Sequence, residues 1–301
     1  MQQVGCLVCS NDKFNLFCNK NRFRIVKCSK CDFIFVNPIP SRSELDKFYK
    51  NFDYRSPISS ELVIRNDAKR SLRVISRFAT GKQDLLDMGC GRGFFLDEAR
   101  AIGWKVFGID YSQKTTDYAS NMLNLDVKRD DILLYQTNKK FSLITMNQVI
   151  EHVLQPKRLI KKCHDLLNSN GYLYIATPNI KSLSARVFGC EFEHLIPPEH
   201  VSFFSKKTLT WLLRDCGFKV SYRGSWGYPE NLAGIIKKLI KNRNKSQRDS
   251  EGNRLIKSSK NFSVTKNIKY TIFDKWFCGL FYKLLEIDNL GINLEVIGYK
   301  D

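Results

Sequence analysis

Apolar residues in the middle of the chain gather in short continuous runs, separated by a stretch with helical spacing. The runs Asp84–Met88 and 104–109 are short and uninterrupted, which is typical of parallel strands buried on both faces. Between them, residues 94–102 have helical spacing, which ends before Gly103. A strand, a helix and a second strand in this order predict an α/β fold with a parallel sheet.

The flanking segments extend this pattern toward both ends. Helical spacing over residues 60–78 predicts an apolar face that covers the sheet. The members of this face are Leu62, Ile64, Leu72, Ile75 and Phe78. Residues 217–222 and 294–299 read as a sixth and a seventh strand, the latter alternating as in an antiparallel edge hairpin. Within the segment that separates them, residues 272–285 predict a helix rich in aromatic side chains.

Cysteines near the N-terminus form two pairs at C-x2-C spacing. The four residues are Cys6, Cys9, Cys28 and Cys31. Two such knuckles joined by a hairpin, here expected over 14–17 and 22–26, close a tetrahedral thiolate site of the kind that holds structural zinc. The alternative is four reduced thiols, but so small a hairpin has little core, and bound metal supplies the missing stability.

These elements divide the chain into four parts. We expect a zinc ribbon over 1–40 and linker helices over 41–80. The core then covers 81–229 and 290–301, interrupted by a basic insertion over 230–289 that carries the amphipathic aromatic helix. The predicted fold class is α/β, with a Rossmann-like sheet and a small N-terminal zinc ribbon.

Charge favours anionic partners, because 49 Lys and Arg residues oppose 30 acidic ones for a net charge of +19. Eleven of these basic residues lie within 237–269, which argues against a catalytic core built to bind nucleic acid. Peripheral membrane contact through residues 237–285 is one hypothesis, and a helix that covers the substrate pocket is the alternative. Without a long apolar run or a secretory signal, the expected location is the cytoplasm, with membrane association as the variant.

Glycines follow the first buried strand at G-x-G-x-G spacing. Gly89, Gly91 and Gly93 open the helix that follows, and Asp110 closes the second strand, where a carboxylate can bind ribose hydroxyls. The third glycine comes one residue earlier than in dinucleotide-binding proteins, and Asp87 would repel a pyrophosphate. Since that carboxylate can bind an ammonium group, the pattern favours S-adenosylmethionine over NAD; a tight turn without ligand is the alternative.

The segment from Asp87 to Gly93 resembles the first motif of class I S-adenosylmethionine-dependent methyltransferases. Residues 127–132, 141–153 and 166–179 resemble later motifs of the same family, apart from Ser142, where the family commonly has Asp. The resemblance implies a seven-stranded sheet and an acidic residue that holds the adenine amino group, Asp131 or its rival Asp130. It also places Tyr111 and Asn147 among the cofactor-binding residues.

The N-terminal cysteine pairs and the following F-V-N-P-x-P segment resemble a zinc-ribbon subgroup often encoded with bacterial surface-glycan and deoxysugar enzymes. Residues 197–205 are similar to a segment of sugar C-methyltransferases in which a Glu-His pair is the general base. The resemblance implies that role for Glu199 and His200, with an imidazole of near-neutral pKa oriented by a carboxylate. His152 is the second candidate base, and a His200 that only pins its loop is the alternative.

The predicted activity is methyl transfer from S-adenosylmethionine to a sugar, either nucleotide-linked or within a surface glycan. Sugar C-methyltransferases carry a second Rossmann-like domain, which we do not expect within these 301 residues, so O-methylation competes with C-methylation. One alternative is an rRNA or tRNA methyltransferase, although we find no N-P-P-Y motif and the ribbon is only mildly basic. Another is a catalytically inactive cofactor-binding scaffold. The sequence predicts no oligomeric state.

Overall fold

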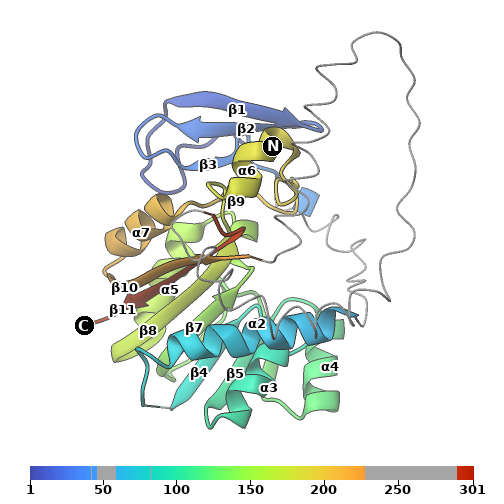
Figure 1. Ribbon diagram of the computed structural model, residues 1–301, viewed down its shortest axis with the longest axis vertical. Coiled ribbons are helices and arrows are strands. Elements are labelled where there is room, and N and C mark those ends of the chain that lie inside the picture. The colour runs from blue at the N-terminus through green and yellow to red at the C-terminus, as the bar shows by residue number, and fades with distance from the viewer. Residues whose placement is uncertain (42, 46–58, 82, 228–289) are drawn as a thin grey trace.

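The computed structural model describes residues 1–41, 43–45, 59–81, 83–227 and 290–301 (Figure 1). A four-stranded sheet near the N-terminus lies above a larger seven-stranded sheet, and helices cover the larger sheet (Figure 1). The predicted insertion 230–289, with its helix over 272–285, lies outside these residues, as does much of the linker before residue 59.

The large sheet is the predicted α/β sheet, with seven strands. Its strands, in spatial order, are β10 (Lys219–Trp226), β11 (Asn293–Tyr299), β8 (Leu167–Pro178), β7 (Phe141–Asn147), β4 (Asp84–Met88), β5 (Lys105–Asp110) and β6 (Val127–Arg129). From β8 to β6 neighbouring strands are parallel, and β11 is antiparallel to both β8 and β10. The fold prediction is therefore confirmed, with β4 at its predicted bounds.

Strand β11 differs from the predicted alternation, because every residue from Asn293 to Gly298 is buried. It is the inner strand of the predicted antiparallel edge hairpin, since it pairs with β10 at the edge and with β8 on its other side. Its Glu295 is fully buried and binds the guanidinium of Arg70 through two hydrogen bonds of 2.8 and 2.6 Å. The hydroxyls of Tyr174 and Tyr222 donate to the same carboxylate at 2.9 and 3.1 Å.

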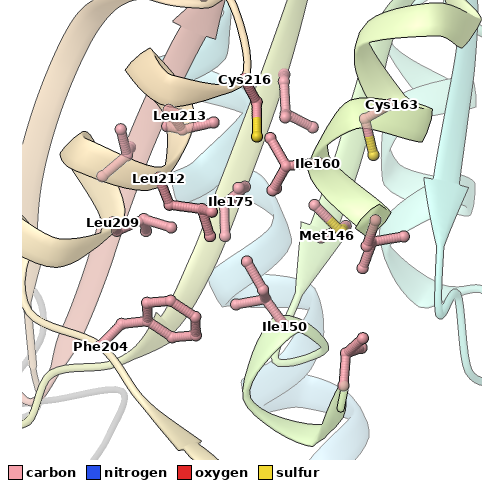
Figure 2. Packing of buried hydrophobic residues seen from close by; sticks show 14 of the residues in the cluster. Met146, Ile150, Ile160, Cys163, Ile175, Phe204, Leu209, Leu212, Leu213 and Cys216 are labelled. Carbon is pink, nitrogen blue, oxygen red and sulfur yellow. The ribbon is translucent and has the colours of Figure 1, made fainter. Parts of the chain in front are cut away.

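Helices lie on both faces of this sheet. They are α2 (Ser59–Ile75), α3 (Phe94–Ala101), α4 (Gln113–Leu123), α5 (Pro156–Leu166) and α7 (Lys206–Asp215), whereas α6 (Leu183–Phe188) packs beside the small sheet. One core cluster packs α2, α3 and α4 against Leu85 and Leu143, while another packs α5 and α7 against Leu86 and Ile175. Figure 2 shows the second cluster, with Leu209, Leu212 and Leu213 of α7 among its residues. The sheet is thus the middle of three layers.

Helix α2 buries only part of its predicted apolar face. Leu72 and Ile75 are buried, whereas Leu62 and Ile64 are 50% and 39% exposed. The periodicity is correct for the C-terminal half of the helix, which packs on the sheet together with Ala68. The N-terminal half faces α3 instead, where its contacts are polar.

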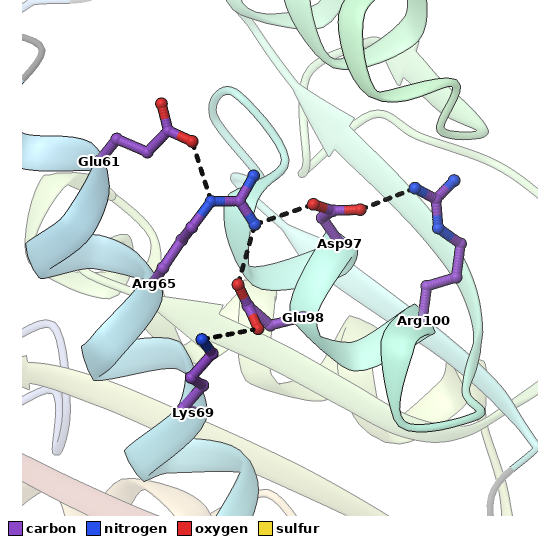
Figure 3. Close-up of polar contacts among 6 residues, drawn as sticks. All are labelled: Glu61, Arg65, Lys69, Asp97, Glu98 and Arg100. Atoms are coloured by element: carbon purple, nitrogen blue, oxygen red, sulfur yellow. Dashed lines mark hydrogen bonds and ion pairs between the residues drawn. The ribbon is translucent and has the colours of Figure 1, made fainter.

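Arg65 makes most of those polar contacts (Figure 3). Its guanidinium donates to Glu61 on its own helix at 2.9 Å, and to Asp97 and Glu98 of α3 at 2.8 and 2.9 Å. Arg100 binds the other oxygen of Asp97 at 2.7 Å. These charges hold α2 against the helix that starts at the glycine turn, with apolar residues of α2 left exposed.

The small sheet contains the predicted N-terminal hairpin and two more strands. Its order is β1 (Phe14–Lys20), β2 (Phe23–Cys28), β3 (Ile34–Val36) and β9 (Ser202–Phe203). Strand β9 comes from the loop after α6, so residues far apart in sequence share this sheet. The rings of Phe33 and Phe204 lie 5.0 Å apart in the core that joins both sheets. The N-terminal hairpin therefore packs directly on the loop that carries His200.

Candidate cofactor and catalytic site

The glycine turn connects the end of β4 to α3. Gly89 and Gly93 both have a φ of +80°, a backbone conformation that side chains disfavour. A Cβ on Gly89 would lie 2.5 Å from Cγ2 of Val149, whereas a Cβ on Gly91 would meet no described atom within 4 Å. The turn is therefore packed against Val149 at Gly89, whereas the space beside Gly91 is free for a ligand.

Asp87 lies on β4 just before this turn and is 2% exposed. Burial raises the pKa of its carboxyl to about 7, although the Thr145 hydroxyl donates to it at 2.7 Å, and the nearby Asp110 raises the pKa further. A carboxyl with this pKa is poised to ionise when a cation binds beside it.

Asp110 ends β5 at the same edge of the sheet. Its carboxylate accepts hydrogen bonds from the backbone N–H of Gly91 at 2.8 Å, the N–H of Ser112 at 2.9 Å and the Thr115 hydroxyl at 3.0 Å. The predicted acidic residue thus binds the glycine turn itself. Tyr111 follows it and is 52% exposed.

The other predicted cofactor residues lie at or just after the carboxyl ends of β6 and β7. The Asp130 N–H donates to the Asp110 carbonyl at 3.1 Å, which places the end of β6 beside that of β5. Asp131 follows, and one of its carboxylate oxygens accepts the Leu133 N–H at 2.8 Å. Asn147 ends β7; its side chain lies close enough to Asp87 to lower the pKa of that carboxyl, and its buried nitrogen makes no hydrogen bond of ordinary geometry with a described residue. A buried donor of this kind needs an acceptor, which a bound ligand can supply.

Histidines gather where the small sheet meets the end of β7. His152 and His200 lie with ring centroids 4.7 Å apart, and the His194 ring stacks on that of His200 at 6.1 Å. Nδ1 of His152 is 2.8 Å from the Glu199 carbonyl oxygen, and Nδ1 of His200 is 2.7 Å from that of His194. Because a carbonyl only accepts, both Nδ1 atoms carry hydrogen. In neutral His200 the lone pair is therefore on Nε2.

Two features of the expected base differ from the prediction. Burial lowers the pKa of His200 to about 3 and that of His194 to about 4, so neither is near neutral. The carboxylate of Glu199 does not orient His200, since it is the Glu199 backbone carbonyl that binds a ring, and that ring belongs to His152. The surrounding protein keeps water away from the His194 and His200 rings, and this disfavours their protonated forms.

Glu151 is a site residue that the sequence analysis did not single out, although it stands in the E-H pair of the fourth-strand motif. It is 1% exposed, burial raises its pKa to about 8, and Thr177 donates to its carboxyl at 2.9 Å. Ligand atoms of Glu151, His152 and His200 lie within 4.8 Å of one another, so these three could also hold a metal ion.

The four N-terminal cysteines converge as their spacing predicts. Sγ of Cys6 lies 3.5 Å from that of Cys31, Sγ of Cys9 lies 3.6 Å from that of Cys28, and all four sulfurs lie within 4.8 Å of one another. Tetrahedral zinc with four thiolates requires sulfur separations of roughly 3.8 Å. Burial opposes ionisation, yet the backbone groups of Cys31 and Lys30 lower the pKa of Cys28 to about 7. The geometry and this thiol fit a zinc ion.

Comparison with known proteins identifies the family to which the part with the seven-stranded sheet belongs. A family described as "Methyltransferase domain" matches residues 63–222, which is just over half of the chain. The chain belongs to this methyltransferase family. The matched range includes the glycine turn, Asp87, Asp110 and the histidine loop, while the cysteine cluster lies outside it.

Curated relatives of this methyltransferase carry one recurrent name. A ubiquinone biosynthesis O-methyltransferase of Coxiella burnetii is 30% identical over 148 residues, which cover 45% of this chain and 63% of that protein. The protein of the same name from Pelagibacter ubique is 30% identical over 179 residues, covering 52% of this chain and 75% of that protein. The chain thus spans less than two thirds of the length of the Coxiella relative.

Solved structures share the fold at low identity. An S-adenosylmethionine-dependent methyltransferase from Archaeoglobus fulgidus has a TM-score of 0.53 and 21% identity, covering 78% of this chain and 94% of that chain. One from Mesorhizobium loti has a TM-score of 0.50 and 15% identity, covering 77% and 98%. At these identities the likeness shows that this methyltransferase has the same fold.

Proposed function

We propose that the chain transfers a methyl group from S-adenosylmethionine to a sugar, nucleotide-linked or within a surface glycan. The observation that carries the proposal is the convergence of the glycine turn, three acidic residues and a neutral histidine at the carboxyl ends of the parallel strands. Ligands in open α/β sheets bind at this edge. The family and the shared fold support the same cofactor.

The residues at this edge fit S-adenosylmethionine group by group. Asp87 would bind the ammonium group, and Asp110 the ribose hydroxyls, exchanging the Gly91 N–H for them. Asp131 or Asp130 would accept from the adenine amino group, with Tyr111 beside the base. The buried Asn147 nitrogen would donate to a ligand oxygen. When bound, the cofactor supplies a methyl group already activated by its sulfonium, so the protein must only align the acceptor and remove its proton.

His200 is the residue that we propose accepts this proton, through Nε2. Its Nδ1 hydrogen is fixed on the His194 carbonyl, which sets both the tautomer and the ring orientation. A pKa of about 3 keeps the imidazole neutral at every working pH, although it makes His200 a weak base. The His152 ring packs against the His200 ring, with the two centroids 4.7 Å apart, and His152 is the alternative base.

An acceptor hydroxyl suits this site, and the curated relatives are named O-methyltransferases, so O-methylation leads and C-methylation is the alternative. The name of the relatives supports ubiquinone precursors as a second acceptor class. Incubation of the protein with S-adenosylmethionine and each candidate acceptor, followed by mass spectrometry, tests both. A product heavier by one methylene identifies the class, and the His200→Ala variant should form it far more slowly. If only a ubiquinone precursor is methylated, the sugar proposal is wrong.

We further propose that Cys6, Cys9, Cys28 and Cys31 hold a structural zinc ion in an N-terminal ribbon over 1–40. Four thiolates leave no open coordination position, so this metal would stabilise the fold without entering the chemistry. Elemental analysis of the purified protein should find one zinc for each chain. Cys28→Ser should lose it, while Cys216→Ser, which changes a buried cysteine outside the cluster, should keep it.

The basic insertion remains a separate proposal. We propose that residues 237–285 contact an anionic membrane surface. This segment lies outside the described residues. Within the part of the chain that the structure describes, no helix is both long and apolar enough to cross a bilayer. Sedimentation with anionic liposomes tests the proposal directly, and an absence of salt-sensitive binding would contradict it.

A further inference from the structure

A hollow whose lining does not include the glycine turn is lined mostly by cations. It has a volume of about 820 Å³. Its walls come from both sheets: Lys27 is on β2, Arg186 on α6, Arg214 on α7 and Arg223 on β10. Seven of the lining residues are Lys or Arg, and one, Asp32, is acidic. Such a concentration of like charge favours an anion in the hollow.

The single carboxylate neutralises only part of this charge. Asp32 pairs with Lys27 at 2.9 Å and with Lys207 at 2.7 Å, and these two lysines lower its pKa to about 2. Among the residues that the structure describes, no acidic group lies within ion-pair distance of Arg214 or Arg223. The hollow therefore keeps a net positive charge after its internal pairs are counted.

Helix α7 presents a polar face to this hollow. Its apolar residues Leu209, Leu212 and Leu213 are buried in the core (Figure 2). Lys206, Thr210 and Arg214 repeat every four residues and so share one helix face, and all three line the hollow. The packing of α7 thus fixes where its cations lie.

Thr210 supplies a second, independent sign of a ligand. The residue is 5% exposed, and its hydroxyl has no hydrogen-bond partner within the described chain. A buried hydroxyl without a partner costs stability, whereas an anionic oxygen in the hollow would accept its hydrogen. Next to it, Trp211 lines the hollow and is partly buried against the core. An indole beside cations suits an aromatic base attached to phosphate.

We propose that this hollow binds a nucleoside diphosphate. Arginines from α6, α7 and β10 would bind the diphosphate oxygens, Thr210 would donate to one of them, and Trp211 would contact the base. Arginine forms paired hydrogen bonds with phosphate, and a hollow of this size exceeds what a lone phosphate fills. The inference does not depend on the proposed sugar acceptor, since it assigns a site outside the cofactor turn.

Titration calorimetry on the 301-residue chain tests the proposal with uridine diphosphate, pyrophosphate and uridine. We expect uridine diphosphate to bind with one-to-one stoichiometry, pyrophosphate more weakly and uridine weakest, with affinity that falls as salt rises. Arg223→Gln and Thr210→Val should each weaken uridine diphosphate by roughly tenfold, the typical worth of one hydrogen bond to a charged group. Lys105→Gln, at the start of β5 and outside the hollow, should leave it unchanged.

The S-adenosylmethionine affinity of every variant serves as the folding control and should not change. No binding of uridine diphosphate, or binding that Arg223→Gln and Thr210→Val both leave intact, would overturn the proposal. So would structured RNA that binds tightly and is not displaced by uridine diphosphate. Inhibition of methyl transfer by uridine diphosphate would identify the site as part of the acceptor subsite. Binding without inhibition would identify a separate ligand site, and both results support the hollow as the site.

Discussion

Asp87 allows a quantitative test, because the same carboxyl should weaken the fold and strengthen cofactor binding. The ordinary pKa of an aspartate is 3.8, and burial raises that of Asp87 to about 7. At ~1.4 kcal/mol for each unit of pKa difference, ionising Asp87 at pH 8 costs the ligand-free fold roughly 4 kcal/mol. Its replacement by asparagine keeps the size and can still accept from Thr145.

The sign follows from proton linkage. The folded state binds the Asp87 proton more tightly than the unfolded chain, so the free energy of unfolding falls as pH rises from 3.8 toward 7 and levels off above it. We therefore expect Asp87→Asn to raise the free energy of unfolding at pH 8 by up to roughly 4 kcal/mol, and to leave it nearly unchanged near pH 4. Urea unfolding at the two pH values measures this.

Cofactor affinity should change in the opposite direction. Only the ionised carboxylate attracts an ammonium group, so the wild-type affinity for S-adenosylmethionine should fall about tenfold from pH 8 to pH 6. In Asp87→Asn, binding should be weaker at pH 8 and lose this dependence. Asp165→Asn, whose side chain is 81% exposed, is the matched control and should change neither property. A less stable Asp87→Asn protein at pH 8, or a wild-type affinity independent of pH, would refute the reasoning.

The remaining predictions concern three residues, those at positions 200, 89 and 295. His200→Ala should lower kcat by roughly a hundredfold or more. In the wild type, kcat at saturating cofactor should show no loss between about pH 7 and 5 from histidine protonation, because the lowered pKa keeps His200 neutral; an acidic limb near pH 6 would contradict this. Gly89→Ala should destabilise the fold by about 1–3 kcal/mol and prevent cofactor binding, measured by thermal melting and calorimetry. Glu295→Gln should cost about 3 kcal/mol in urea unfolding because Arg70 keeps a buried charge, and a cost below about 1 kcal/mol would show that water reaches the pair.

Local sequence patterns predicted those helices and strands whose formation depends on neighbouring residues in the sequence. The run Asp84–Met88 matches β4 because a short apolar run before a glycine turn admits few other structures. The apolar period of α2 was right only where the sheet supplies a partner, and Leu62 and Ile64 are exposed because charges join that half to α3. Periodicity indicates that a face exists, whereas the neighbouring element decides whether it is buried.

The site was predicted in part for the same reason. Motif spacing located Asp87, Asp110 and the cysteine cluster, since each belongs to one turn or one pair of knuckles. The protonation state of His200 could not be read from the sequence, because burial by a distant part of the chain causes it. Strand β9 is two residues long, too short for any periodic signal, and its pairing with β3 is long-range.

That pairing bears on how such a protein can be rearranged. The backbone N–H of Val36 on β3 donates to the carbonyl of Val201, one residue after His200, so the N-terminal segment braces the loop that carries the histidines. Deleting residues 1–40 would leave β9 with an open edge and strip Phe204 of its neighbour Phe33. This N-terminal segment and the loop should therefore be exchanged between homologues only as a pair, and a chimaera that replaces either one alone should be inactive.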